Sequence, residues 1–336
     1  MMKEKKCVLV TLADKNYLVQ AKQLFSSVYH NSGWKWDYML LAHEIPDDQL
    51  AWFREKGILV KHVRSLSKRD FPWLPATVLS KFYVFTEEFK KWDIVVFLDG
   101  DIIVRASLDG LTNVTGFAAV ADIDSATVRS QFLARSALNG EKDEKDLTEL
   151  KAAYDLNIAA FNSGVFSFTT DIIKKDTFAR LRKLITKFGR ISKFEQSLLN
   201  LYFYRKWQHL PMAYNTYFIH VRQGHLPSRG IRFEGIVNHY IFNKPWKYNI
   251  PKITKDWEQN LAKAERIDLS KRPGPKKVWT KKELEDAEKL LRFNQLPANP
   301  ISRALVKSVR SLDRTIGLFG LWLKRSAPGL YRKIKV

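Results

Sequence analysis

Asp99 and Asp101 are the residues of this sequence that most clearly suggest chemistry, because they flank Gly100 directly after the apolar run 94–98. A spacing of two residues places both carboxylates on one side of an extended backbone. Two buried like charges cost several kcal/mol unless something neutralises them. A divalent cation would do so, and oxygen ligands suit Mg²⁺ or Mn²⁺. The alternative is a pair of turn aspartates that cap the next segment, but the apolar residues on both sides favour the metal.

An imidazole and an ammonium group lie much later in the chain, within residues 237–246. His239 could supply a third metal ligand in its neutral form. Lys244 could hold a phosphate as a point charge and stabilise a leaving diphosphate. A surface loop that happens to contain both residue types is the alternative.

Two further polar segments could contribute to a binding site. Residues 161–165 form a polar turn that enters an apolar strand, and Gly164 could permit close approach of the backbone to a ligand. An ordinary tight turn is the alternative. Glu195 and Gln196 place a carboxylate and an amide at the start of a helix. That helix start could also be satisfied by its own side chains.

Strands and helices alternate along the first half of the chain, which predicts a mainly parallel sheet covered on both faces. Ligands of such open α/β sheets bind at the carboxyl ends of the strands, where the aspartate pair falls. The predicted strands are residues 6–12, 38–41, 58–60, 94–98, 116–120 and 164–168, and the predicted helices in this part are 16–29 and 47–56.

The later segments have different compositions. Residues 125–156 are polar and predict a long insertion that could cover an active site, and 171–188 predict a basic amphipathic helix. Residues 271–277 have the Pro, Gly and charge content of a linker. Thr280 and Glu283 form a capping-box pattern, which predicts a helix to about Phe293. We therefore expect a domain over 1–250 and a basic, helical extension over 251–336.

The composition indicates a folded protein of 336 residues, since 45% are hydrophobic and 13% aromatic. Cys7 is the single cysteine, which excludes an intramolecular disulfide and fits a reducing cytosol, and its apolar neighbours predict a small core residue. No run approaches the length of a transmembrane helix, and the N-terminus lacks a convincing signal peptide. These features predict an intracellular protein.

The formal charge of +22 requires an anionic partner, which could be nucleic acid, phospholipid or a phosphorylated substrate. Residues 252–336 contain 21 basic and 9 acidic residues. After Pro300 a helix is predicted with an apolar stripe opposite a basic side. Such a helix suits the surface of an anionic membrane, although it could also pack on the rest of the chain. The stripe is Ile301, Leu305, Val309, Leu312, Ile316, Phe319 and Leu323, and the basic side is Arg303, Lys307, Arg310 and Arg314.

The segments above, in their order along the chain, resemble glycosyltransferase family 8 over roughly residues 7–250. This family includes glycogenin and bacterial lipooligosaccharide galactosyltransferases. The joint pattern carries the resemblance. Its matching parts are Leu12–Tyr17, Leu79–Phe82, Asp99-Gly100-Asp101, Phe161–Val165, Glu195-Gln196, Leu210-Pro211, Tyr214-Asn215, and His239 with Lys244-Pro245-Trp246.

The resemblance implies an α/β fold of the GT-A nucleotide-diphospho-sugar transferase type, with a mainly parallel central sheet flanked by helices and a basic helical C-terminal extension. It also implies a UDP-hexose donor, with glucose or galactose as the sugar, and retention of the anomeric configuration. The acceptor would be a saccharide or a lipid-linked saccharide, as in lipopolysaccharide or capsule biosynthesis. That acceptor and the basic tail would place the protein in the cytoplasm, peripheral on the inner face of the membrane.

The resemblance also implies the roles of individual residues. Asp99, Asp101 and His239 would hold Mn²⁺ or Mg²⁺. Lys244 would neutralise the departing UDP, Gln196 would lie near the oxocarbenium-like centre, and Glu195 would orient the sugar. The remaining donor contacts would be Ala13, Asp14, Asn16 and Tyr17 with the uracil and ribose, Lys81 with the ribose or diphosphate, Asp99 and Gly100 beside the metal, and Asn162 and Gly164 with the sugar.

The implied mechanism needs no covalent nucleophile, because the acceptor hydroxyl attacks from the face that the leaving phosphate occupies, and that phosphate can accept the proton. Glu195 is the candidate if a nucleophile is used. The sequence departs from the family pattern at two places. The closing motif is one residue shorter, with Phe242 where the family has glycine, and Glu195 replaces the usual aspartate.

Two other functions remain open at this stage. A pseudoenzyme that binds a sugar nucleotide without turnover is compatible with the shortened closing motif. A nucleic-acid-binding protein is compatible with the charge, but no basic-aromatic groove motif supports it, so we expect no nucleic-acid partner. Residues 125–156 and the tail are expected to choose the acceptor, and Asp122 and Asp124 are candidates to face it.

Overall fold

The computed structural model describes eight stretches of the chain, which are residues 5–67, 76–123, 125–134, 137–138, 140–217, 234–241, 244–247 and 251–295. The chain divides into two compact units, of which the first ends at Glu285 and the second begins at Asp286. The sheets and all the residues discussed as a site belong to the first unit. That unit includes residues 251–285, which the sequence assigns to the extension.

The main sheet of the described residues has seven strands in the order β3-β2-β1-β4-β7-β6-β8. Its first four strands are mutually parallel, and β7 is antiparallel to both of its neighbours. This arrangement confirms the predicted mainly parallel sheet. The strands are β1 (Cys7–Ala13), β2 (Asp37–His43), β3 (Leu59–Val63), β4 (Ile94–Leu98), β6 (Phe117–Ala121), β7 (Phe161–Thr169) and β8 (Trp207–His209).

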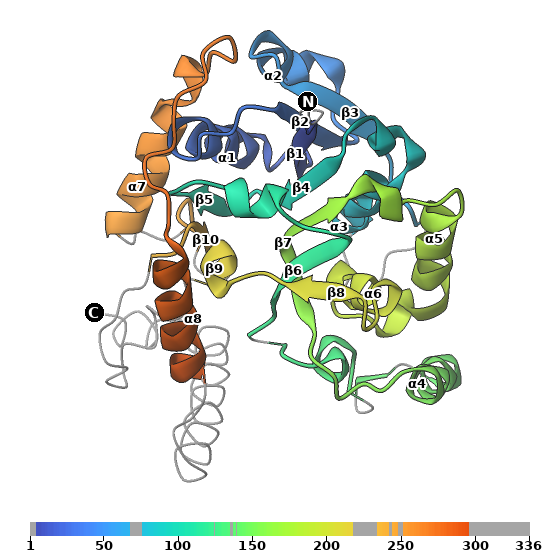
Figure 1. Ribbon diagram of the computed structural model, residues 1–336. Helices are drawn as coiled ribbons and strands as arrows, with labels where there is room; N and C mark the ends of the chain where they lie inside the picture. The colour runs from blue at the N-terminus through green and yellow to red at the C-terminus, as the bar shows by residue number, and fades with distance from the viewer. Residues whose placement is uncertain are drawn as a thin grey trace, which may run out of the picture. The chain divides into compact units, whose positions relative to one another are not determined.

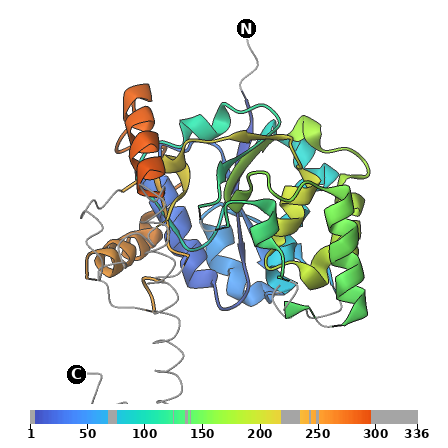
Figure 2. The same ribbon diagram turned by 90° about the horizontal axis from the view of Figure 1, so that it is seen from below.

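Helices cover both faces of this sheet, as the two views in Figures 1 and 2 show. On one face, Phe25 of α1 (Leu18–Asn31) contacts Tyr38 of β2, with ring centroids 5.8 Å apart. On the other face, Val8 and Val10 pack in a large cluster with Phe85. The helices on that side are α3 (Ala76–Leu79), the 3₁₀ turn Ser80–Phe85, α5 (Thr177–Phe188) and α6 (Glu195–Tyr202). Strands that are buried on both faces explain the continuous apolar runs of the sequence.

A small second sheet has the order β5-β10-β9 among the described residues. Its strands are β5 (Ile102–Val104), β9 (Thr216–Tyr217) and β10 (Val237–His239). β5 follows the aspartate pair directly, and β10 is antiparallel to it, with His239 opposite Ile102. The pairing therefore carries His239 across to Asp101.

α7 (Pro251–Ala262) packs against α1, and both lie next to β5 (Figure 1). The Tyr29 hydroxyl of α1 donates a hydrogen bond to the backbone oxygen of Asp268, at 2.9 Å. Trp257 of α7 belongs to a small core cluster with Ile103 and Tyr240. Residues 251–268 therefore pack against α1 and the small sheet as part of the same folded unit.

Most predicted elements are present, and the differences have local causes. The segment 171–188 becomes helical only at Thr177, after a 3₁₀ turn at Thr170–Ile172. The helix predicted over 47–56 is divided between a 3₁₀ turn (Asp47–Leu50) and α2 (Ala51–Glu55). The polar turn expected at 161–165 is already part of β7. The insertion contains α4 (Glu141–Ala153), whose Leu147 and Leu150 are buried.

The capping box at Thr280 is confirmed at the start of α8 (Lys281–Gln295). The Glu283 amide donates to the Thr280 hydroxyl at 3.2 Å, and the Thr280 amide donates to the Glu283 carboxylate at 2.8 Å. No described helix has both the length and the apolar character needed to cross a bilayer. The helix predicted after Pro300, together with Asp124 and Phe242, lies outside the described residues.

Candidate active site

Asp99, Asp101 and His239 come together where β4 ends and β10 meets β5, and their potential ligand atoms lie within 4.8 Å of one another. The backbone fixes all three. The backbone amide of Asp99 donates to the backbone oxygen of Gly164 at 2.8 Å, and the backbone amide of Tyr240 donates to the backbone oxygen of Asp101 at 2.9 Å. The His239 Nε2 atom lies 3.1 Å from Asp101 Oδ1 and 4.0 Å from Asp99 Oδ2. The structure thus assembles the three residues that the sequence suggested as metal ligands.

A chain of buried amides orients the His239 ring. The Gly164 amide donates to Asn162 Oδ1 at 2.8 Å, and Asn215 Nδ2 donates to the same oxygen at 2.9 Å. The Asn215 Oδ1 atom must then be the acceptor that faces His239 Nδ1, at 2.9 Å. This places a ring proton on Nδ1 and turns Nε2 toward the two carboxylates, where it donates to Asp101 in the charged ring and offers a lone pair in the neutral ring.

That donor set fits a small divalent cation. Two carboxylates and a neutral imidazole nitrogen are ligands that Mn²⁺ and Mg²⁺ sites use. A lone pair that faces two carboxylates is satisfied by a cation between them. Asp99, Asp101 and His239 are therefore the residues that would hold it.

Lys81 is a buried cation beside the two carboxylates, because its Nζ atom lies 2.9 Å from Asp99 Oδ1 and 2.6 Å from Glu195 Oε1. Burial alone would lower the pKa of Lys81, but the Asp99 and Glu195 carboxylates outweigh it and hold that pKa above its ordinary value. Ser163 donates a further hydrogen bond to Glu195 Oε1, at 2.6 Å. The Glu195 carboxylate is therefore held on one oxygen by two donors.

Lys244 is the second cation, and it forms an ion pair with Asp101. Burial tends to raise the pKa of Asp101, but His239 and Lys244 outweigh it and hold the pKa of that carboxyl well below its usual range. Burial raises the pKa of Asp99, and Lys81 does not fully offset it. Three carboxylates thus share two ammonium groups, so an added cation would stabilise the site at Asp99.

A pocket of about 320 Å³ opens beside these groups. Gln196 spans its wall, because its Oε1 atom accepts from Asn162 at 3.0 Å and its Nε2 atom donates to Asp122 at 2.6 Å. The residues around the pocket are Asp99, Asp101, Asp122, Ser125, Asn162, Ser163, Phe194, Glu195, Gln196, Tyr217, His239 and Ile241. The aspartate pair and the polar segments near Asn162 and Glu195 therefore share one cavity.

The loop after β1 lies next to the aspartate pair and outside the wall of that cavity. The Asn16 amide donates to the Asp14 carboxylate at 2.8 Å, and Ala13 is buried at the end of β1. The Tyr17 ring meets the Trp246 ring edge to face, with centroids 6.1 Å apart. Gly100 faces Tyr17, since a β-carbon at Gly100 would lie 3.8 Å from the Tyr17 ring. These contacts join the loop after β1 to the segment that carries Lys244.

Some residues of the site had no assigned role at the sequence level. Ser163 holds Glu195 and Lys81, and Asn215 holds His239. Ser163 and Asn215 both lie in segments that carried the resemblance, and that position was the available sequence signal for a role in the site. Asp122 was named only as a residue that could face an acceptor, and its contact with Gln196 depends on pairing between β6 and β7 that no local pattern encodes.

Residues 8–250 match the model of the glycosyl transferase family 8. The chain belongs to this family. Its curated relatives include the glycosyltransferases GlyF and GlyA of Streptococcus pneumoniae serotype 4 (strain ATCC BAA-334 / TIGR4). The identity to GlyF is 25% over 267 residues, covering 74% of this chain and 60% of GlyF. The identity to GlyA is 25% over 260 residues, covering 73% of this chain and 33% of GlyA. The chain thus spans less than two thirds of either relative.

Two solved structures show the same fold. The galactosyltransferase LgtC in complex with donor and acceptor sugar analogues has a TM-score of 0.54 and 16% identity, over 77% of this chain and 95% of LgtC. The bifunctional glycosyltransferase WbbM has a TM-score of 0.56 and 18% identity, over 80% of this chain and 53% of WbbM. These likenesses confirm the expected α/β fold of the GT-A type for this family 8 member.

Proposed function

We propose that the protein is a metal-assisted, retaining glycosyltransferase that moves a hexose, glucose or galactose, from a UDP-sugar to a saccharide or lipid-linked acceptor. The observation that carries the proposal is the joint position of Asp99, Asp101 and His239 beside a pocket whose wall includes Asn162, Glu195 and Gln196. A metal site next to a cavity lined by hydrogen-bonding groups suits a donor with a diphosphate at one end and a sugar at the other.

Mn²⁺ or Mg²⁺ bound at this site would neutralise charge on the diphosphate of the leaving nucleotide. Lys244 stands beside Asp101 and can turn its ammonium group to the same diphosphate. The loop of Ala13, Asp14, Asn16 and Tyr17 lies on the other side of Gly100, where it can receive the uracil and ribose. The Lys81 ammonium is engaged by Asp99 and Glu195, so we assign it mainly to holding those carboxylates in place.

The sugar would occupy the cavity between Gln196 and the metal ligands. The Gln196 amide, fixed at both ends by Asn162 and Asp122, presents a dipole that can stabilise positive charge at the anomeric carbon. Glu195 orients the sugar through its carboxylate, and its tight hold by Lys81 and Ser163 argues for positioning rather than nucleophilic attack. The acceptor hydroxyl then attacks on the face of the leaving phosphate, which accepts its proton.

The charge of the chain supports the proposed location, and the resemblance to the family supports the proposed acceptor. A basic tail would hold the protein on the cytoplasmic face of an anionic membrane, where lipid-linked saccharides of lipopolysaccharide or capsule assembly are elongated. Vesicle pelleting of the full chain and of a chain that ends at Pro300 tests this part. Equal pelleting of both with anionic vesicles would refute it.

A donor screen tests the enzyme itself. Release of UDP from several UDP-sugars is measured with Mn²⁺ and with a chelator, for the wild type, Asp101→Asn and the exposed control Asp48→Asn. We expect metal-dependent release that Asp101→Asn abolishes and Asp48→Asn keeps. UDP binding without release from any donor would instead identify a pseudoenzyme.

A further inference from the structure

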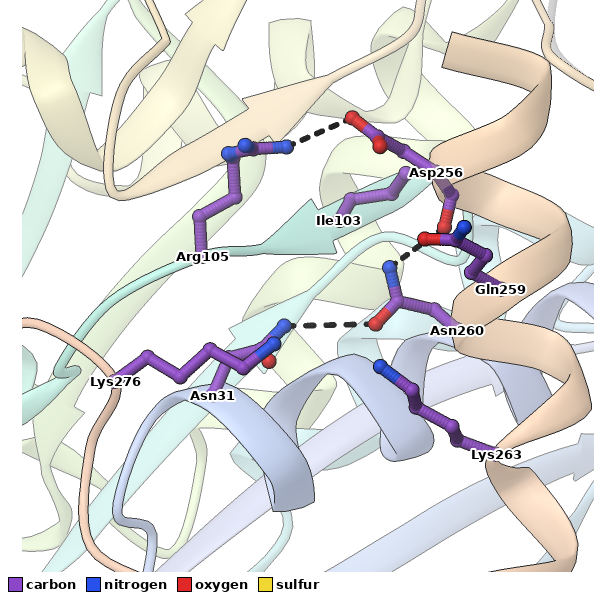
Figure 3. A pocket seen from close by; sticks show the side chains of 8 residues that line it. All are labelled: Asn31, Ile103, Arg105, Asp256, Gln259, Asn260, Lys263 and Lys276. Atoms are coloured by element: carbon purple, nitrogen blue, oxygen red, sulfur yellow. Dashed lines mark hydrogen bonds and ion pairs between the residues drawn. The ribbon is translucent and has the colours of Figure 1, made fainter. Parts of the chain in front are cut away.

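A second pocket, of about 130 Å³, lies away from the metal ligands, between the end of α1, the end of β5 and α7 (Figure 3). Its polar lining comes from four separate segments of the first unit. The residues that matter here are Asn31, Arg105, Asp256, Asn260, Lys263 and Lys276. None of them belongs to the proposed catalytic machinery.

Three cationic side chains line the pocket, and Asp256 is the single carboxylate among its lining residues. Arg105 is paired, because it lies 3.0 Å from Asp256 and 2.7 Å from Glu234. Lys263 and Lys276 form no ion pair with any residue in the described stretches. Burial lowers the pKa of Lys276, and the positive charges of Lys263 and Arg105 lower it further. The two lysines line the same pocket, so their like charges oppose each other there.

Asn31 supplies a second and independent feature. Its side chain is buried, with 4% of the residue exposed, and its Nδ2 atom donates to the Val104 oxygen at 2.7 Å and to Asn260 Oδ1 at 3.5 Å. Its Oδ1 atom is buried without a hydrogen-bond partner in the described structure. An unpaired buried acceptor costs free energy, which a donor in the pocket would recover.

We propose that this pocket binds a phosphate group, with Lys263 and Lys276 as its cationic partners and a hydroxyl on or beside the phosphorus as the donor to Asn31. A phosphate is large enough to reach two ammonium groups at once, and charge-assisted bonds to both remove their repulsion. Arg105 and Asp256 also line the pocket, and the ion pair between them neutralises that carboxylate. The phosphate can come from a soluble compound or from the headgroup of a phospholipid.

The competing account is that Lys263 and Lys276 only complement the negative ends of helices. Lys263 follows α7, and the backbone amide of Lys276 donates to the backbone oxygen of Asn31 at the end of α1, at 3.0 Å. In that case the lysines would stabilise the fold without any preference for phosphate over chloride.

A phosphorus NMR titration of the full chain with inorganic phosphate, at constant ionic strength set with chloride, separates the two accounts. The double variant Lys263→Gln/Lys276→Gln is compared with Lys255→Gln/Lys282→Gln, which loses the same charge at exposed positions. We expect the dissociation constant to rise about tenfold or more in the first and to stay unchanged in the second. Equal dissociation constants in both variants would overturn the proposal. If the double variant does not fold, the single variant Lys276→Gln carries the comparison.

A second arm identifies the source of the phosphate. Pelleting with phosphatidylglycerol vesicles is compared with phosphatidylcholine vesicles for the same variants. Loss of the phosphatidylglycerol preference in Lys263→Gln/Lys276→Gln alone identifies a lipid headgroup. An unchanged vesicle preference, together with the loss of inorganic phosphate binding, identifies a soluble phosphate.

Discussion

Gly164 lies so close to His239 that a β-carbon on it would stand 2.2 Å from the imidazole Cε1 atom. No real contact is that short, so the imidazole can hold its place only because residue 164 has no side chain. The glycine is part of β7, and its amide also donates to Asn162. It therefore contacts both a proposed metal ligand, His239, and a residue of the proposed sugar pocket, Asn162.

Replacing this glycine should therefore displace the imidazole. We expect Gly164→Ala to weaken Mn²⁺ binding about tenfold or more, because removal of one properly placed ligand loses a large part of the metal affinity. Titration calorimetry with Mn²⁺ measures the change. Gly274→Ala is the control, since a β-carbon there meets nothing within 4 Å. Unchanged Mn²⁺ affinity in Gly164→Ala would mean that His239 is not a ligand.

Asn215 should tune the metal site without touching the metal. Asn215→Leu removes the acceptor that holds the His239 Nδ1 proton, so the ring loses its orientation. We expect Mn²⁺ affinity to fall about 10–100-fold, the range typical for the loss of such a partner. The exposed residue Asn113 offers the matched control Asn113→Leu. Equal affinities in the two variants would contradict the assigned orientation.

Lys81 should be important for stability as well as function. Lys81→Met leaves Asp99 and Glu195 buried without their shared cation, which should cost about 3–5 kcal/mol of the free energy of unfolding. Urea denaturation measures it. The partly exposed pair of Lys61 and Glu88 is the comparison, because Lys61→Met should cost only about 0–1 kcal/mol. Adding Glu195→Gln to Lys81→Met should recover part of the loss, whereas a further loss would argue against this charge balance.

Trp257 should support the proposed contact with the donor from outside the site. Its ring lies 5.7 Å from that of Trp246, which follows Lys244 by two residues and contacts Tyr17. We expect Trp257→Ala to weaken binding of UDP in the presence of Mn²⁺, and Trp257→Phe to restore most of it. Titration with UDP tests both, with Trp52→Ala as the control. A loss of thermal stability with normal UDP affinity would leave Trp257 a purely structural residue.

Cys7 should be unreactive in the folded protein. Burial raises the pKa of its thiol from 9.0 to about 11, so the thiol stays protonated at pH 8, and the side chain is 1% exposed. Ellman's reagent should label it only after unfolding. The folded thiol loses its proton at a higher pH than the unfolded thiol. Its contribution to the free energy of unfolding is therefore complete below pH 9 and is lost as the pH rises to about 11. Rapid labelling at pH 8 without unfolding would contradict this.

The sheet could be predicted because its strands carry their own signal. β4 is an uninterrupted apolar run, and β1 is interrupted only by Thr11. A strand that is buried on both faces leaves that pattern whatever its neighbours are. β5, β9 and β10 are only two or three residues long, too short for any periodicity. They exist because they pair with one another, so no local pattern could reveal them.

The residues of the candidate site likewise fall into those that a local sequence pattern reveals and those that depend on contacts between distant segments. Asp99 and Asp101 were apparent from spacing, because both belong to one strand end. His239 and Lys244 were candidates by residue type, and the resemblance joined them to the aspartate pair. The pairing of β10 with β5 is the physical reason that they reach Asp101. Asn215 and Ser163 position other side chains, namely His239 and Glu195. Asparagine and serine are common in many contexts, so neither residue type indicates such a role in a sequence.

The small sheet also sets an order of events during synthesis. β5 leaves the ribosome with the two aspartates, but β10 is made more than a hundred residues later, since His239 and Asp101 are 138 positions apart. A nascent chain that already contains the whole of the main sheet therefore lacks the imidazole, the Lys244 ammonium and the strand that positions them. The proposed metal site can therefore close only after residues 239–244 have been made.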